Sequence, residues 1–205
     1  MKKIFFRLFK KGNSRDFIII VSGLPRSGTS LMMSMLAAGG LEVLTDNLRE
    51  ADADNPAGYY ELEEVKKLIN GEHFWIARSR GKVVKVISTL LPYLPAGYRY
   101  RIVFMRRAME EILASQRRML INRGENPDKV SDDQMAEIFE KNLQQIDRWI
   151  DSQANATRID INYNQLIEKP RPLVAEINIF MGGGLDEEKM LGVIDPSLYR
   201  QRISK

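Results

Sequence analysis

The chain has 205 residues, of which 44% are hydrophobic and 28% charged, and its formal net charge is +4 at pH 7. This length suits one compact domain with its own hydrophobic core, so we expect a single domain over residues 1–205. The lack of cysteine excludes disulfides and thiolate metal sites, and a single histidine, His73, disfavours a histidine-rich site, so we predict no metal. The net charge is low for a nucleic-acid-binding protein, but it suits a small anionic ligand if it is focused in one cleft.

Residues 1–15 are expected to form a basic N-terminal arm. Basic and bulky apolar residues mix within residues 1–11, which suits weak contact with an anionic membrane surface. The alternative, which we favour, is an arm that packs on the domain or moves freely. Charges at Arg7, Lys10 and Lys11 interrupt the apolar region that a signal peptide needs, and no run is long enough to cross a bilayer. We therefore predict a cytoplasmic protein. Its oligomeric state is not predicted.

Residues 17–21 form a continuous apolar run that is typical of a strand buried in a parallel sheet. Residues 30–38 are predicted to form a helix that ends at Gly39 and Gly40. The loop between these elements is bounded by Gly23 and Gly28. A strand, a glycine-bounded loop and a helix direct several backbone N–H groups at one point, and that point attracts an anion, most often a phosphate.

The spacing from Gly23 to Gly28 and Ser30 is that of the phosphate-binding P-loop, G-x-x-x-x-G-K-[ST], with one departure. Thr29 occupies the position of the lysine, and Arg26 lies three residues earlier in the loop. A P-loop NTPase needs that lysine at the outer phosphates of its nucleotide. The sequence therefore predicts an anion-binding loop whose positive charge comes from Arg26 and not from a lysine after Gly28.

Between residues 41 and 87 the sequence predicts a long connection followed by a second strand. Residues 45–54 are acidic and form either a solvated loop or a functional loop over the site. Residues 55–58 are a turn signal, and we expect a helix at residues 62–70. Residues 82–87 read as a buried strand with Lys85 near its end. A buried lysine is costly unless an anion meets it, so Lys85 either faces a ligand or marks an edge strand.

The remaining elements alternate between strands and helices. We expect strands at residues 100–105 and 157–163, and helices at 108–122, 131–150 and 172–181 with a short helical tail. Arg106 and Arg107 fall at the carboxyl end of the third strand, where ligands collect in open parallel sheets. The order of elements predicts an α/β three-layer sandwich with a mainly parallel central sheet.

Several segments resemble the family of sulfotransferases that use 3′-phosphoadenylyl sulfate (PAPS). Residues 23–30 have its G-x-P-R-S-G-T-[ST] loop, Arg107 and Ser115 have its strand-end arginine and serine eight residues apart, and residues 163–170 have its Y-x-x-L-x-x-x-P segment. Residues 55–61 resemble the N-P-x-G-Y-Y/F-E segment of bacterial members. The resemblance implies a P-loop NTPase-like fold and transfer of a sulfuryl group from PAPS to a hydroxyl or amine acceptor, which is a small molecule, a glycan or a peptide.

The resemblance also implies a role for each matching residue. The backbone of residues 27–30 would bind the 5′-phosphosulfate, with Arg26 and Lys85 offsetting charge at the leaving oxygen, and Arg107 and Ser115 would hold the 3′-phosphate. The predicted donor-binding residues are Gly23, Pro25, Arg26, Ser27, Gly28, Thr29, Ser30, Arg107 and Ser115.

The predicted catalytic residues are Arg26, Glu61 and Lys85. Cytosolic members carry a K-T-H segment whose histidine is the catalytic base, whereas this chain has Lys85-Val86-Ile87. We therefore predict Glu61 as the base, because it follows a defined turn at a helix start, with Asp54 and His73 as alternatives. Contacts on the adenosine side are not predicted firmly, and residues 195–200 are one candidate segment.

Two other functions remain open at the level of sequence. The first is a P-loop kinase or NTPase, for which Asp160 is a weak candidate as the strand-end aspartate. The second is a non-catalytic module that binds a nucleotide or the desulfated product, 3′-phosphoadenosine 5′-phosphate (PAP), because the base is not obvious.

Overall fold

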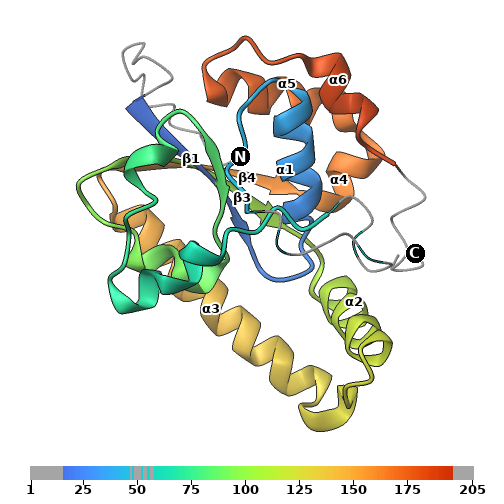
Figure 1. The fold of residues 1–205 in the computed structure, drawn as a ribbon. Coiled ribbons are helices and arrows are strands. Elements are labelled where there is room, and N and C mark those ends of the chain that lie inside the picture. The colour runs from blue at the N-terminus through green and yellow to red at the C-terminus, as the bar shows by residue number, and fades with distance from the viewer. Residues whose placement is uncertain (1–15, 47, 49–51, 53–54, 56–57, 196–205) are drawn as a thin grey trace.

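The computed structural model describes residues 16–46, 48, 52, 55 and 58–195 (Figure 1). The predicted basic arm at residues 1–15, with its proposed membrane contact, lies outside the described residues. None of the helices in the described part of the chain is both long enough and apolar enough to cross a membrane.

A sheet of four parallel strands forms the middle of the described domain, in the order β2-β1-β3-β4. The strands are β1 (Phe17–Gly23), β2 (Val83–Lys85), β3 (Arg99–Arg106) and β4 (Ala156–Asn162). All seven residues of β1 are buried, as expected for a strand covered on both faces. Val21 pairs with Lys85 on one side and with Val103 on the other, so the carboxyl ends of β2, β1 and β3 meet at one edge of the sheet.

Helices cover both faces of this sheet and connect its strands. The α-helices are α1 (Thr29–Ala38), α2 (Met109–Asn122), α3 (Asp132–Ser152), α4 (Tyr163–Glu168), α5 (Pro170–Met181) and α6 (Glu187–Gly192). The 3₁₀ helices are η2 (Glu63–Asn70), η3 (Ala77–Ser79), η4 (Ser88–Tyr93) and η5 (Pro127–Lys129).

Two apolar clusters fill the spaces between the layers. On one face, Ile18 and Phe104 of the sheet pack with residues of η2, η4 and α3, among them Ile146. On the other face, Val21 and Met105 pack with α1, α4, α5 and α6 (Figure 1). The predicted α/β three-layer sandwich with a parallel central sheet is confirmed.

The structure differs from the predicted elements in four places. Residues 63–70 form a 3₁₀ helix rather than an α-helix, and β2 has three residues because the chain turns at Ile87 into η4. The short helix α4 was not predicted; it begins where the side chain of Asn162 accepts a hydrogen bond from the backbone N–H of Gln165 at 3.0 Å. The following helix, α5, begins at Pro170, two residues before the predicted start.

Candidate active site

A large cavity of about 1090 Å³ opens where β1, β2 and β3 end. Its walls come from the loop after β1, the end of β2, α2, α4 and the segment after α6, together with Asp52, Asn55, Tyr59 and Glu61. Ten of the eleven predicted site residues line this one cavity: Gly23, Pro25, Arg26, Gly28, Thr29, Ser30, Glu61, Lys85, Arg107 and Ser115. The topology therefore brings together residues that are up to 92 positions apart in the sequence, from Gly23 to Ser115.

Two glycines allow the loop after β1 to pass close to its neighbours. Gly28 has φ +97°, and a Cβ atom there would lie 2.4 Å from the ring of Tyr163. At Gly23, with φ +152°, a Cβ atom would lie 2.8 Å from the carbonyl oxygen of Met105. Any other residue at either position would displace the loop or its neighbours, so the loop geometry depends on both glycines.

Ser27 is the predicted site residue that does not line the cavity. Its side chain is buried, its Oγ donates to the carbonyl oxygen of Leu24 at 2.7 Å, and its backbone N–H donates to the same oxygen at 3.2 Å. Both donors of Ser27 are thus used inside the loop, which corrects the expectation that its backbone binds the phosphosulfate. The donors that remain for an anion are the N–H groups of the first turn of α1, which have no partner within the helix.

Lys85 is hydrogen-bonded to Ser30, which follows the loop at the start of α1. Its Nζ donates to Ser30 Oγ at 3.1 Å and to the carbonyl oxygen of Tyr59 at 2.8 Å. The Nδ2 of Asn55 donates to the same Ser30 Oγ at 2.9 Å. Lys85 lies in β2, an edge strand of the described sheet, and it lines the cavity at the end of that strand; that it faces a ligand stays a prediction.

The side chain of Arg26 contacts α2. Its Nε donates to Ser115 Oγ at 2.9 Å, and its backbone has φ +66°, an uncommon conformation for a residue other than glycine. Its carbonyl oxygen accepts a hydrogen bond from Arg107 Nη1 at 3.0 Å. The two predicted 3′-phosphate residues, Arg107 and Ser115, are therefore both bonded to the same loop residue.

Arg107 is enclosed by groups from three elements. Its Nε donates to Glu111 Oε2 at 2.9 Å, and its guanidinium carbon lies 4.5 Å from the centre of the Tyr163 ring. The other oxygen of Glu111 accepts from Asn164 Nδ2 at 2.8 Å. Glu111 is buried, and a buried carboxylate needs partners of this kind.

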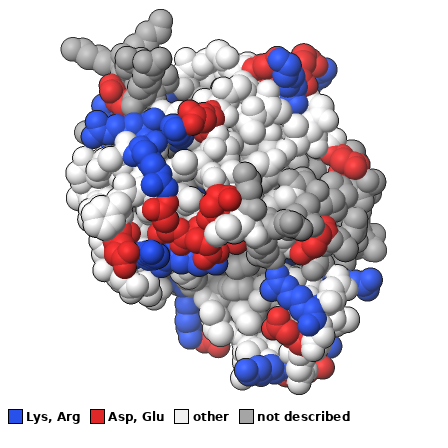
Figure 2. Space-filling view, viewed as in Figure 1, with Lys and Arg blue, Asp and Glu red and all other residues white. Residues whose placement is uncertain are grey.

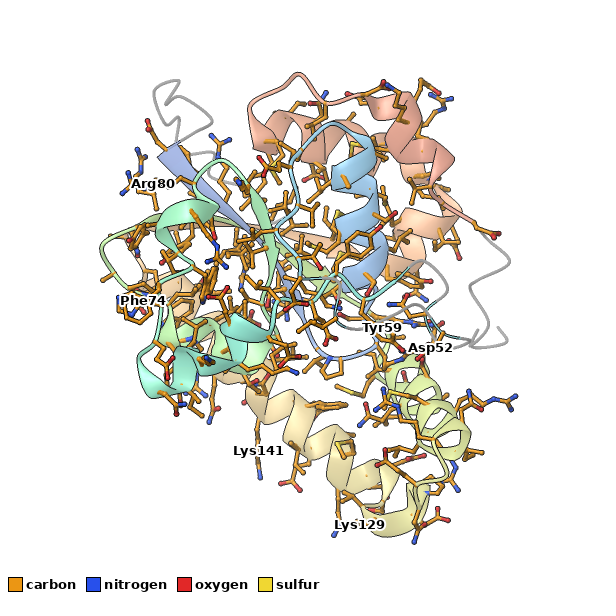
Figure 3. The ribbon with its side chains drawn as sticks, viewed as in Figure 1. Asp52, Tyr59, Phe74, Arg80, Lys129 and Lys141 are labelled. Atoms are coloured by element: carbon orange, nitrogen blue, oxygen red, sulfur yellow. The ribbon has the colours of Figure 1, made fainter. Side chains whose placement is uncertain are left out.

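Of the three candidate bases, the structure places only one, Glu61, at the cavity among the residues it describes. Glu61 lines the cavity, and its carbonyl oxygen accepts from Thr45 Oγ1 at 2.8 Å, which fixes its backbone. His73 is exposed and does not line the cavity. Its neighbour in the sequence, Phe74, is labelled at the left edge of Figure 3, whereas Tyr59, which lines the cavity, is labelled right of the centre. The remaining alternative, Asp54, lies outside the described residues.

Sequence reasoning assigned no role to several polar residues that the structure places in or beside the cavity. Asp52 and Tyr59 both line it, and the Tyr59 hydroxyl lies 2.8 and 2.7 Å from the two carboxylate oxygens of Asp52 (Figure 3). Asn55 and Tyr59 belong to the N-P-x-G-Y-Y-E segment that the sequence analysis matched, so this segment could have identified them as site residues. Glu111 follows Arg107 by four residues, a spacing that places two side chains on one face of a helix.

One wall of the cavity is apolar. Leu31 follows the loop in α1, Ile167 lies in α4 and Val193 follows α6; all three line the cavity. Asp195, from the segment considered for the adenosine side, also lines it, while residues 196–200 lie outside the described part. The lining of the cavity therefore includes cationic and polar groups as well as apolar side chains against which an organic ring can pack.

Asp160, the aspartate considered for a kinase-like metal site, does not line the cavity. Its carboxylate is bonded to Arg106 Nε at 2.8 Å and to Arg158 Nε at 3.1 Å. Within the described residues, no group of three or more histidine and acidic side chains is arranged to hold a metal ion.

Neither a scan of protein-family models nor a search of curated proteins gave a match. Solved structures of sulfotransferases do match. The sulfotransferase domain of the Synechococcus PCC 7002 olefin synthase aligns at a TM-score of 0.57 and 16% identity, covering 96% of this chain and 92% of that domain. The sulfotransferase domain from the curacin biosynthetic pathway gives 0.55 and 16%, with 92% of each chain covered. Sulfotransferase STF1 from Mycobacterium tuberculosis H37Rv gives 0.58 and 20%, with 86% of this chain and 71% of that one covered. The chain thus has the fold of these sulfotransferases.

Proposed function

We propose that the protein is a sulfotransferase that moves the sulfuryl group of PAPS to a hydroxyl or amine of an acceptor. The observation that carries this proposal is that the loop of residues 23–30, through all its residues except Ser27, lines one cavity together with Lys85, Arg107 and Ser115. A PAPS molecule carries anionic groups at its 5′ and 3′ positions, and the cavity has two separate groups of anion-binding residues. The sulfotransferase fold supports the same reading.

In this proposal the 5′-phosphosulfate lies at the start of α1. The N–H groups of the first helical turn donate to its oxygens, and Lys85 offsets the charge that develops at the leaving oxygen. The 3′-phosphate lies between Arg107 and Ser115, close to the guanidinium of Arg26, which is 2.9 Å from Ser115 Oγ. The adenine packs on the apolar wall of Leu31, Ile167 and Val193.

The cavity fits a ligand of this kind. Its volume of about 1090 Å³ exceeds the roughly 300–1,000 Å³ of ordinary small-molecule sites, so a nucleotide and part of an acceptor can share it. Because Gly28 has no Cβ atom, the loop can pack directly against the ring of Tyr163 at the start of α4. On the face that Figure 2 shows, groups of basic and of acidic side chains lie next to one another among uncharged residues.

The chemical contribution of the protein is orientation, charge stabilisation and proton removal. Sulfuryl transfer from a bound donor resembles phosphoryl transfer, in which positioning and electrostatics supply most of the rate enhancement. Glu61 lines the same cavity as Lys85, and we propose that its carboxylate takes the proton of the acceptor. Arg26 has its Nε on Ser115, so we propose that it acts mainly on the 3′-phosphate side and that Lys85 is the principal cation at the leaving group.

Two observations favour this function over its rivals. Asp160 is bonded to arginines away from the cavity, which leaves a kinase-like enzyme without its strand-end aspartate. Glu61 and Lys85 line the cavity together with the anion-binding loop, which favours an enzyme over a module that only binds nucleotide. A cytoplasmic location, a bacterial source and the acceptor classes named above stay predictions.

A thermal-shift experiment tests the proposed function. PAP at about a hundred times its Kd should add about 2.7 kcal/mol of stability without magnesium, or roughly 5–10 °C for a chain of this size. ATP with magnesium should give a clearly smaller shift, because Thr29 replaces the lysine that its outer phosphates need. If ATP with magnesium stabilises the protein and PAP does not, the proposed function is wrong.

A further inference from the structure

We infer that Glu111 is a positioning residue that holds Arg107 in the orientation required to bind the 3′-phosphate, and that Asn164 in turn anchors Glu111. This inference rests on the proposed function, because it concerns the donor site of that reaction. It assigns a role to two residues that no motif in the sequence marks.

The burial of the pair is the first observation. The side chain of Arg107 is 8% exposed and that of Glu111 is 2% exposed, and Glu111 is the only fully buried acidic residue among those the structure describes. Burying two charges is costly, and a buried ion pair often stabilises a protein no more than apolar side chains of similar size would. Stability alone is therefore a weak reason for a carboxylate at this position.

The geometry of the pair is the second observation. Glu111 Oε2 accepts from Arg107 Nε at 2.9 Å, while Glu111 Oε1 accepts from Asn164 Nδ2 at 2.8 Å. The carboxylate therefore bridges α2, which carries Glu111, and α4, which carries Asn164. Arg107 Nε is therefore bonded to a carboxylate that is itself held by a residue of a second helix.

The rest of the guanidinium is held by two further groups. Arg107 Nη1 donates to the carbonyl oxygen of Arg26 at 3.0 Å, and the guanidinium lies over the Tyr163 ring at 4.5 Å. An arginine side chain has many rotamers, and fixing one of them before a ligand arrives removes that entropic cost from binding. A planar guanidinium held in this way has one fixed orientation toward a phosphate.

The inference predicts a selective loss of 3′-phosphate recognition. In Glu111→Gln the side-chain shape is nearly unchanged, but the charge that orients Arg107 is removed. We expect its affinity for PAP to fall about tenfold or more, equivalent to about 1.4 kcal/mol. Its affinity for adenosine 5′-phosphosulfate, which lacks the 3′-phosphate, should change less than about threefold, since that ligand does not use Arg107.

Isothermal titration without magnesium measures both ligands against a set of matched variants. Glu110→Gln removes the same charge from the exposed neighbouring position and should alter neither affinity. Arg107→Ala sets the size of a complete loss of 3′-phosphate recognition. Asn164→Ala keeps the charge of Glu111 but removes its anchor, so it should lower PAP affinity in the same direction and by less; it also decides the question if Glu111→Gln does not fold.

Three results would count against these ideas in different ways. Wild-type protein that does not bind PAP contradicts the proposed function, and the inference falls with it. Wild-type protein that prefers PAP, together with Glu111→Gln and Asn164→Ala that keep the full preference, overturns the inference alone. Tighter binding of PAP by Glu111→Gln also overturns it, because the carboxylate would then compete with the phosphate for Arg107.

Discussion

The hydroxyl of Ser30 receives hydrogen bonds from two distant parts of the chain. Lys85 Nζ and Asn55 Nδ2 both donate to its Oγ, at 3.1 and 2.9 Å. A serine hydroxyl has two acceptor lone pairs and one donor. With both acceptor positions used, the O–H of Ser30 is directed elsewhere and is suited to donate to an anion at the loop. The contact with Ser30 and a second bond to the carbonyl oxygen of Tyr59 hold Lys85 beside the loop.

Glu61 is the residue whose proposed role is most directly testable. Glu61→Gln keeps the shape of the side chain and removes the basic carboxylate, so turnover should fall by about 10²–10⁴. PAP affinity and melting temperature should stay near the wild-type values, because the backbone contact of Glu61 with Thr45 is unchanged. Transfer of radiolabelled sulfuryl groups to an acceptor found by screening measures the turnover.

The control for this variant is Glu63→Gln, which removes the same charge from an exposed residue paired with Lys66 outside the cavity. It should leave turnover unchanged. Near-normal turnover in Glu61→Gln would contradict the proposed role and shift attention to Asp52, which also lines the cavity, or to Asp54.

At the scale of elements, the loop after β1 and the start of α4 depend on each other. The ring of Tyr163 occupies the space that a side chain at Gly28 would need, and it also carries the guanidinium of Arg107 on its face. A change in the loop should therefore reach both anion-binding regions of the cavity. This coupling links the 5′ and 3′ sides of the proposed donor site.

Gly28→Ala tests this coupling. The new Cβ would lie 2.4 Å from the Tyr163 ring, and φ +97° is strained for alanine, so the loop or the ring must move. We expect PAP affinity to fall at least tenfold and the melting temperature to decrease. Gly97→Ala is the matched control, because no atom lies within 4 Å of the new Cβ and Gly97 has no positive φ; it should change neither quantity. Wild-type PAP affinity in Gly28→Ala would refute the coupling.

The elements that could be predicted from the sequence are those with strong local signals. The apolar run of β1 and the glycines that bound the following loop each act within a few residues, and the structure confirms β1 and the helix expected after the loop. The short helix α4 and the 3₁₀ geometry of η2 were missed, because a helix of six residues spans fewer than two turns and gives a weak periodic signal, and local sequence does not separate 3₁₀ from α.

The contacts that complete the candidate site could not be predicted for a different reason. Asn55 and Ser30 are 25 residues apart, and Asn164 and Glu111 are 53 apart. Such pairs form only when the sheet order brings their elements together, and no local pattern encodes that order. The position of Arg26 against Ser115 is of the same kind, since the loop motif gives the residue but not the direction of its side chain.

At the scale of the whole molecule, a network of ion pairs on β3 and β4 stabilises the sheet that supports the cavity. Asp147 of α3 accepts from Arg106 Nη2 of β3 at 2.5 Å and from Arg158 Nη1 of β4 at 2.6 Å. Asp160 of β4 bonds to both arginines as well. Burial opposes the charge of Arg106, but its bonds to the two aspartates outweigh that effect and raise its pKa. Three elements are thus joined through one carboxylate.

Asp147→Asn should therefore lower stability without altering the donor site. The amide keeps one acceptor but loses the charge that serves two partly buried arginines, at a cost of about 1–2 kcal/mol, or a melting temperature lower by about 2–8 °C. PAP affinity should stay at its wild-type value, because neither Asp147 nor its partners line the cavity. Asp151→Asn makes the same charge change at an exposed residue 3.6 Å from Arg158, and it should shift the melting temperature by less than about 2 °C. Equal decreases in the two variants would show that general surface charge, and not the link between α3, β3 and β4, supports the sheet.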